Sequence, residues 1–200
     1  MTTAFVRRAL LGVAALAMAA VVAALALGPR SSDDRGLLTR IASIGGAFEL
    51  TTHEGRRLAS TSLAGRPFVV FFGFTRCPDI CPTTLLEMSN HLAALGEMGD
   101  RLTTLFVTID PEHDTAEHLA AYLNSFDPRI TGLTGSPAEI AHVARMYRAY
   151  YEKVPTSGGY TMNHTATVYL MDRQGNLAGT MSFQEPESTQ REKLARLIGG

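Results

Sequence analysis

Cys77 and Cys81 are the only cysteines in this chain of 200 residues, and three residues separate them. A disulfide between such near neighbours closes a very short loop, so it would constrain the unfolded chain little and contribute little to stability. Soft thiolate ligands suit copper(I), and two neighbouring thiols can also alternate between dithiol and disulfide forms. The pair therefore predicts a soft-metal site or a redox-active disulfide. The competing interpretation is an inert disulfide, or two buried cysteines that act as small hydrophobic residues.

The residues around the cysteines predict a strand before them and a helix after them. Residues 68–72 form an uninterrupted apolar run, which is typical of a strand buried on both faces of a sheet. Pro82 suits the first position of a helix, because the amide there has no partner within the helix. Cys81 would then be the N-cap of a helix over residues 82–95, where the helix dipole favours a thiolate. We expect both sulfurs to be deprotonated near neutral pH and to face the same space, as copper ligands do.

The rest of the chain alternates strand-like and helix-like segments, which predicts an α/β fold with a mixed central sheet flanked by helices. Asp114, with Glu117 as its capping-box partner, is the expected N-cap of the second helix, and Ser136 is the expected N-cap of the third. The expected elements are a hairpin over residues 47–58, strand 68–72, helix 82–95, strand 102–109, helix 115–124, helix 137–147, strands 165–171 and 177–183, and helix 187–198. The cysteines follow the first buried strand, at the edge where open α/β sheets bind ligands.

A metal site needs at least one more ligand, and the chain offers six histidines. Four of them have plainer explanations, because they fall in a predicted helix or in the hairpin turn. These are His53, His91, His118 and His142. His113 follows the second buried strand, and His164 lies where a glycine-rich loop enters a strand. Spacing alone does not choose between these two.

The N-terminal region predicts a membrane anchor. Residues 9–27 carry no charge and follow Arg7 and Arg8; as a helix they would be roughly 28 Å long, close to the thickness of the apolar core of a bilayer. A cleaved signal peptide, with a small-residue site at residues 24–26, is the alternative. The expected organisation is a cytoplasmic tail over residues 1–8, a transmembrane signal anchor over residues 9–27, a linker over residues 28–40 and a soluble domain over residues 41–200.

The length of the tail predicts which side of the membrane the domain occupies. Because only eight residues precede the span, the long segment after it is expected to be translocated. This orientation puts the domain in the periplasm, or another extracytoplasmic space, if the membrane is a bacterial inner membrane. The net charge of −1 and the charged fraction of 18% provide no basic surface for nucleic acid. We therefore expect a membrane-bound protein with no nucleic-acid partner.

Three segments carry a family resemblance. Residues 73–82 read Gly-Phe-Thr-Arg-Cys-Pro-Asp-Ile-Cys-Pro, residues 107–115 read Val-Thr-Ile-Asp-Pro-Glu-His-Asp-Thr, and His164 is followed by Thr165. Together they resemble the Cys-x-x-x-Cys-Pro, Asp-Pro-x-x-Asp-Thr and His segments of the Sco/SenC family, and the resemblance extends from about residue 41 to the end of the chain. Members of that family are thioredoxin-like, membrane-anchored proteins that help to assemble cytochrome c oxidase.

The resemblance implies a copper site, for Cu(I) or Cu(II), formed by Cys77, Cys81 and His164. It also implies a metallochaperone, more a carrier than an enzyme, which delivers copper to the dinuclear copper centre of cytochrome c oxidase subunit II. Two positions depart from the family pattern. Asn163 stands where the family usually has aspartate, so a negative charge near the metal is missing. His113 stands where the family often has arginine, as an accessory ligand or as a surface substitution.

The main alternative is a thiol–disulfide oxidoreductase that reduces the cysteines of the oxidase copper site through a redox-active Cys77–Cys81 pair. A redox motif in a thioredoxin-like fold is normally Cys-x-x-Cys and has no need of His164, whereas the additional residue here leaves room for a metal between the sulfurs. Both roles can coexist, because copper loading requires the reduced dithiol. A peroxiredoxin-like peroxidase would need a Pro-x-x-x-Thr-x-x-Cys pattern, and the proline at the matching position is absent.

Overall fold

The computed structural model describes Met18 and residues 44–200. Apart from Met18, the expected tail, anchor and linker over residues 1–40 lie outside the described residues. Within the part of the chain that is described, no helix is both long enough and apolar enough to cross a membrane.

The described domain is built on a mixed sheet of seven strands in the order β2-β1-β5-β4-β3-β8-β9. The central strands β3, β4 and β5 are parallel to one another, and β1, β2, β8 and β9 add to them by antiparallel pairing. The strands are β1 (Glu49–Thr52), β2 (Arg57–Ala59), β3 (Phe68–Gly73), β4 (Thr103–Thr108), β5 (Ile130–Thr134), β8 (Val168–Met171) and β9 (Leu177–Met181). The expected α/β fold with a mixed central sheet is confirmed.

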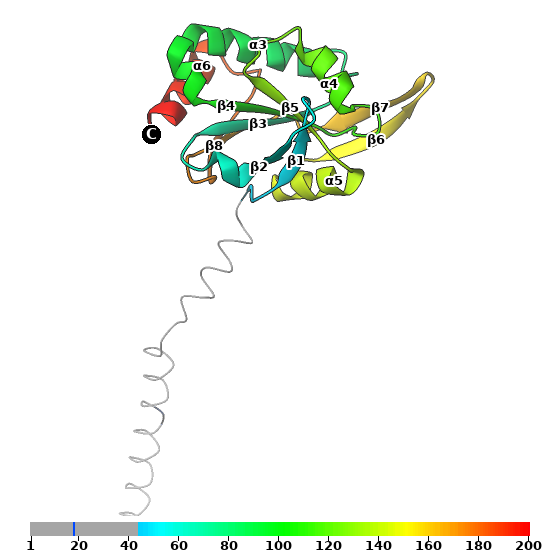
Figure 1. The fold of residues 1–200 in the computed structure, drawn as a ribbon, viewed down its shortest axis with the longest axis horizontal. Coiled ribbons are helices and arrows are strands. Elements are labelled where there is room, and N and C mark those ends of the chain that lie inside the picture. Colours follow the sequence, from blue (N-terminus) through cyan, green and yellow to red (C-terminus); the bar gives the residue numbers. More distant parts are fainter. Residues whose placement is uncertain (1–17, 19–43) are drawn as a thin grey trace, which may run out of the picture. The chain divides into compact units, whose positions relative to one another are not determined.

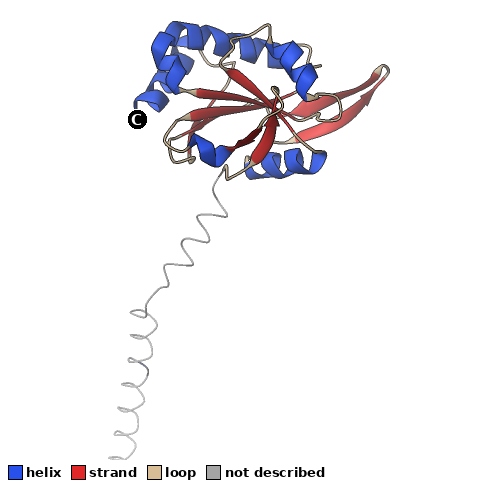
Figure 2. Ribbon diagram, in the orientation of Figure 1, coloured by secondary structure: helices blue, strands red, loops and turns tan. Residues whose placement is uncertain are grey.

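Helices cover both faces of this sheet. Figure 1 shows α3, α4 and α6 along one side of the strands and α5 along the other, and Figure 2 shows the same layers by type of element. The helices are α3 (Ile80–Leu95), α4 (Ala116–Leu123), α5 (Pro137–Met146) and α6 (Glu187–Gly199), with 3-10 turns η1 (Ser60–Leu63) and η2 (Gly96–Arg101). At α5 the expected Ser136 cap is confirmed as a reciprocal capping box with Glu139.

The apolar run in β3 is explained by burial on both faces. All six of its residues are buried. Phe71 packs against Phe106 on the face that α3 and α4 cover, whereas Phe72 packs against Tyr147 and Tyr169 on the other face. Such a strand has no solvent-facing side on which polar residues would alternate.

Within the main sheet, the sequence pattern did not predict β5, which lies between α4 and α5 in the chain. Its sequence, Ile-Thr-Gly-Leu-Thr, contains Gly132, and glycine weakens a strand pattern. The glycine is required by close packing, because a Cβ at this position would lie 2.6 Å from Cδ1 of Leu123 on α4. The close approach of α4 to the sheet therefore requires a glycine in β5, and this glycine weakens the sequence pattern from which a strand would be predicted.

The segment before β8 is the second difference. The sequence predicts a glycine-rich loop there, but the structure forms a separate two-stranded antiparallel sheet, β6 (Tyr151–Thr156) paired with β7 (Gly159–His164). Gly159, at φ +132°, supplies the positive φ that the turn between the strands needs. In Figure 1 this β6–β7 arm extends away from the main sheet. His164 is thus the last residue of a strand, directly opposite Tyr151.

Candidate metal centre

The cysteine loop joins the end of β3 to the start of α3. The helix begins at Ile80, one residue before Cys81, with Asp79 at the N-cap. The expectation that Cys81 caps the helix and that Pro82 opens it is therefore wrong by two positions. Pro82 does not destabilise the helix at this position, because the amides of the whole first turn lack helical partners and proline is tolerated there. Within this turn, the Cys81 amide donates a hydrogen bond to Sγ of Cys77, which precedes the helix, at 3.4 Å.

Gly73 allows Cys81 to approach the sheet. Cys81 is fully buried, and a Cβ on Gly73 would lie 2.7 Å from its Sγ and 2.6 Å from the ring of Phe106. Real side chains do not tolerate such distances without displacing their neighbours. The last position of β3 is therefore a glycine because the sulfur of Cys81 rests on the strand.

Within the described residues, Cys77, Cys81 and His164 form a candidate metal-binding cluster. One ligand atom from each residue lies within 4.8 Å of the others, and Cys81 Sγ is 3.6 Å from His164 Nε2. The imidazole meets the rings of Phe71 and Phe74 edge-on, at centroid distances of 6.3 and 5.8 Å. These contacts fix the ring plane beside the sulfurs.

A single hydrogen bond determines which nitrogen of His164 is free. Nδ1 lies 3.0 Å from the carbonyl oxygen of Thr165. A carbonyl oxygen only accepts, so Nδ1 carries the proton and donates. Nε2 of the neutral ring then keeps its lone pair and faces Cys81, which is the state that a metal ligand needs.

The two thiols differ in protonation. Hydrogen bonds lower the pKa of Cys77 to about 3, chiefly the one from the Cys81 thiol, with backbone amides of Asp79 and Cys81 adding to it against the cost of burial. The pKa of Cys81 is raised, because its thiol donates to Cys77 and is desolvated. The expectation of two thiolates is therefore wrong for the metal-free protein. The opposite directions of the two pKa shifts favour a proton on the buried sulfur of Cys81.

The other five histidines lie outside the cluster. His113 Nδ1 donates to Asp114 at 2.9 Å, and its ring stacks on His118 with a centroid distance of 5.0 Å. His91 is fully buried and bonds to Gln190. The remaining two are His53, which accepts from the amide of Gly132, and His142, which is exposed. The structure thus favours His164 over His113 as the third ligand.

Asp114 is a structural residue of the site that the sequence assigned wrongly. Thr115, and not Asp114, is the N-cap of α4. The fully buried Asp114 carboxylate instead accepts hydrogen bonds from Thr75 N and Oγ1, at 3.0 and 2.6 Å, and from Thr108 Oγ1 at 2.7 Å. It thereby ties the cysteine loop to the end of β4. In sequence, an acidic residue just before a helix can be either a helix cap or a buried hydrogen-bond acceptor. Only the three-dimensional structure distinguishes these two roles.

Taken together, the mixed sheet, its flanking helices and the Cys77–Cys81–His164 cluster define a thioredoxin-like α/β protein with a two-cysteine, one-histidine site at one end of its sheet. The matching family model spans residues 38–199 and is described as SCO1/SenC. The chain belongs to the SCO1/SenC family.

Relatives and solved structures agree with this assignment. Protein sco1 of Schizosaccharomyces pombe is 37% identical over 161 residues, which cover 78% of this chain and 60% of that protein. The structure of Bradyrhizobium japonicum ScoI with copper bound is 46% identical and covers 78% of this chain and 99% of that one, with a TM-score of 0.73. Yeast Sco1 with copper bound is 33% identical, covering 79% and 90%, with a TM-score of 0.72. The chain spans less than two thirds of the length of its curated relatives.

The unequal thiols predict selective alkylation of the metal-free protein. Iodoacetamide reacts with thiolates, so at pH 6 it should modify Cys77, whose pKa is lowered to about 3, and leave the buried Cys81 intact. Peptide mass spectrometry gives the ratio of the two products, and the urea-unfolded protein, in which both thiols are ordinary, is the control. Equal modification of both cysteines in the folded protein would contradict the assigned protonation.

The buried carboxylate predicts a stability effect. Asp114→Ala leaves the Thr75 amide and two hydroxyls without their acceptor, so it should lower the free energy of unfolding by roughly 3 kcal/mol. The matched control is Asp100→Ala, because Asp100 is exposed and its pair with Arg129 lies on the surface, where the expected loss is below about 1 kcal/mol. Urea denaturation measures both. Similar losses for the two variants would show that Asp114 does not hold the loop.

Proposed function

We propose that this protein is a copper metallochaperone of cytochrome c oxidase assembly, with Cys77, Cys81 and His164 as the copper ligands. The observation that carries the proposal is the convergence of these three donors within 4.8 Å from two segments far apart in the sequence. Thiolate sulfur suits Cu(I), and imidazole suits copper in either oxidation state. The tautomer of His164 already directs the unprotonated Nε2 toward the sulfurs.

The number of ligands supports a role in copper transfer over a role in copper storage. Three protein donors leave copper open to attack by a further ligand, so cysteines of a partner can take the metal by stepwise exchange. Access is available on one side of the site, because Cys77 is only half-buried and its neighbours Pro78 and Asp79 are exposed. Cys81, fully buried, would be the last sulfur to release the metal.

The partner and the location complete the proposal. The family resemblance supports subunit II of cytochrome c oxidase, with its dinuclear copper centre, as the recipient. The copper-bound structures of Bradyrhizobium japonicum ScoI and yeast Sco1 support copper as the cargo. The uncharged stretch over residues 9–27 supports anchoring in a bacterial-type inner membrane, with the domain on the extracytoplasmic side. The mildly acidic chain gives no reason to add nucleic acid to the partners.

A second function, thiol–disulfide exchange with the cysteines of the recipient, is favoured by one observation. Cys77 is the more accessible of the two sulfurs and its pKa is lowered, and an accessible thiolate is the attacking group in disulfide exchange. Attack on a disulfide of the recipient would form a mixed disulfide and release one recipient thiolate. Cys81 would then displace the second, which leaves the recipient reduced and Cys77 and Cys81 joined in a redox-active disulfide.

Complementation separates the two functions. In cells that lack their own Sco protein, the full chain should restore oxidase activity, and Cys77→Ser, Cys81→Ser and His164→Ala should each fail because each removes a copper ligand. Added copper should improve the His164→Ala variant more than the cysteine variants, since two soft ligands remain. His142→Ala, a change of an exposed histidine on α5, is the matched control and should behave as wild type.

The pattern of rescue decides between copper delivery and thiol exchange. Full rescue by His164→Ala without added copper, together with failure of both cysteine variants, would contradict the metallochaperone and support the oxidoreductase. Full rescue by a cysteine variant would contradict both functions.

A further inference from the structure

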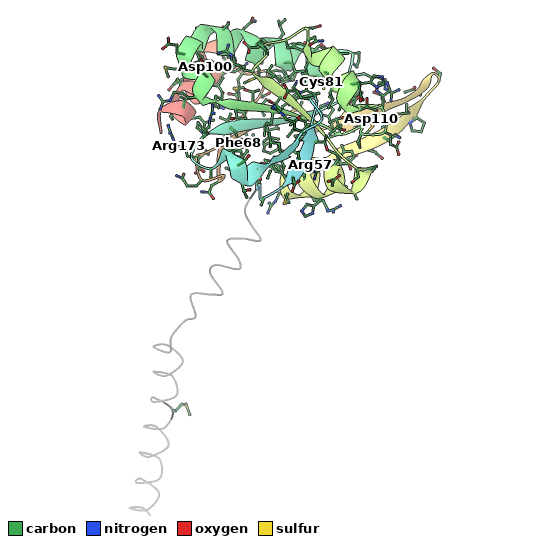
Figure 3. The ribbon with its side chains drawn as sticks, viewed as in Figure 1. Arg57, Phe68, Cys81, Asp100, Asp110 and Arg173 are labelled. Atoms are coloured by element: carbon green, nitrogen blue, oxygen red, sulfur yellow. The ribbon has the colours of Figure 1, made fainter. Side chains whose placement is uncertain are left out.

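A second cluster of side chains lies beside the cysteine loop and joins it to the arm that carries His164. Asp110, which follows β4 and is 2% exposed, accepts a hydrogen bond from Arg76 at 2.9 Å. The hydroxyl of Tyr160 on β7 lies 3.0 Å from both oxygens of the same carboxylate and donates to them. Three segments therefore meet at one buried carboxylate, and one of its partners, Arg76, directly precedes Cys77 in the chain. In Figure 3, Asp110 lies at the end of the domain from which the arm extends.

Two cations also hold the ring of Tyr160. The guanidinium carbon of Arg76 and the ammonium nitrogen of Lys153 each lie 4.1 Å from the centroid of the ring. Lys153 on β6 also forms an ion pair with Glu112, which follows β4, at 2.6 Å. The tyrosine is thus fixed by its hydroxyl and by its ring, and both strands of the arm are attached to the segment after β4.

The geometry of β7 connects Tyr160 to His164. Alternate residues of a strand share a face, so Tyr160, Met162 and His164 lie on one side of β7. Each of them contacts the main domain: Tyr160 reaches Asp110, Met162 is buried in the core, and His164 meets Cys81. An isolated two-stranded hairpin is only marginally stable in water. The position of His164 therefore depends on the contacts that hold the arm against the domain.

We propose that Tyr160 is a positioning residue that holds His164 at the copper site and so sets how long copper is retained. The inference rests on the proposed copper-binding function and deepens it. While the hydroxyl of Tyr160 is bonded to Asp110, β7 stays in place and Nε2 of His164 remains within reach of the metal. When that contact opens, the arm moves outward and takes the imidazole with it, which leaves copper on the two sulfurs and open to a recipient.

Removal of one oxygen atom tests this proposal. Tyr160→Phe keeps the ring that the two cations contact but removes the hydrogen bond to the carboxylate. Hydrogen bonds to charged groups contribute roughly tenfold or more in an equilibrium, so copper(I) should leave the variant roughly tenfold faster than the wild-type full chain. The rate is read from the colour of bicinchoninate, a chelating probe added in excess to the copper(I)-loaded protein.

Two comparisons distinguish positioning from a general loss of structure. Tyr150→Phe is the matched control, because it removes a tyrosine hydroxyl bond to Glu152 at the exposed base of the same arm, and its release rate should equal that of wild type. The second comparison repeats Tyr160→Phe in a His164→Ala background. If Tyr160 acts through His164, the change should have no further effect there, since the ligand that it positions is already absent.

Each outcome has one meaning. Faster release from Tyr160→Phe that disappears in the His164→Ala background supports the proposal. Equal acceleration in both backgrounds, or no acceleration while His164→Ala releases copper quickly, overturns the role of Tyr160 and leaves the copper site in place. Unchanged release from His164→Ala itself would show that His164 is not a ligand, which overturns both the proposed site and the inference.

Discussion

The contact between Cys81 and His164 is the constraint on which the site depends. These residues are 83 positions apart in the chain, yet Sγ and Nε2 lie 3.6 Å from each other. Cys81 belongs to the first turn of α3, and His164 ends the β6–β7 arm. The parallel strands β3 and β4 bring the cysteine loop and the segment of Asp110 to the same end of the sheet, and the arm returns the histidine to that end.

Several small features keep this contact in place. The missing side chain of Gly73 lets Cys81 rest on β3, and the buried carboxylate of Asp114 holds Thr75 at the start of the loop. On the histidine, the Thr165 carbonyl fixes the tautomer. On the cysteines, hydrogen bonds, chiefly the one from the Cys81 thiol, lower the pKa of Cys77. The imidazole thus presents its lone pair to the two sulfurs.

The sequence predicted what local pattern and chemistry determine. Features that depend on residues close together in the chain could be predicted. These are the apolar run of β3, the helix after the cysteines, the Ser136 cap, and the choice of Cys77 and Cys81 as the reactive pair. Spacing left both His113 and His164 as candidate ligands, because the role of a third ligand depends on a tertiary contact. The family resemblance favoured His164, and the fold places His164 beside the cysteines. The strand β5 was missed because Gly132 weakens its pattern, and its glycine is explained only by the close approach of α4.

Asp114 was misassigned because a buried acceptor and a helix cap look alike in sequence. The Asp110–Tyr160 contact, across 50 positions, left no local signal at all.

The most direct test of the three-ligand site is the X-ray absorption spectrum, at the copper edge, of the full chain loaded with copper(I). The account predicts a first shell of two sulfur atoms and one nitrogen, with the multiple-scattering pattern of an imidazole that disappears in His164→Ala. A first shell of sulfur alone in the wild-type protein would contradict it.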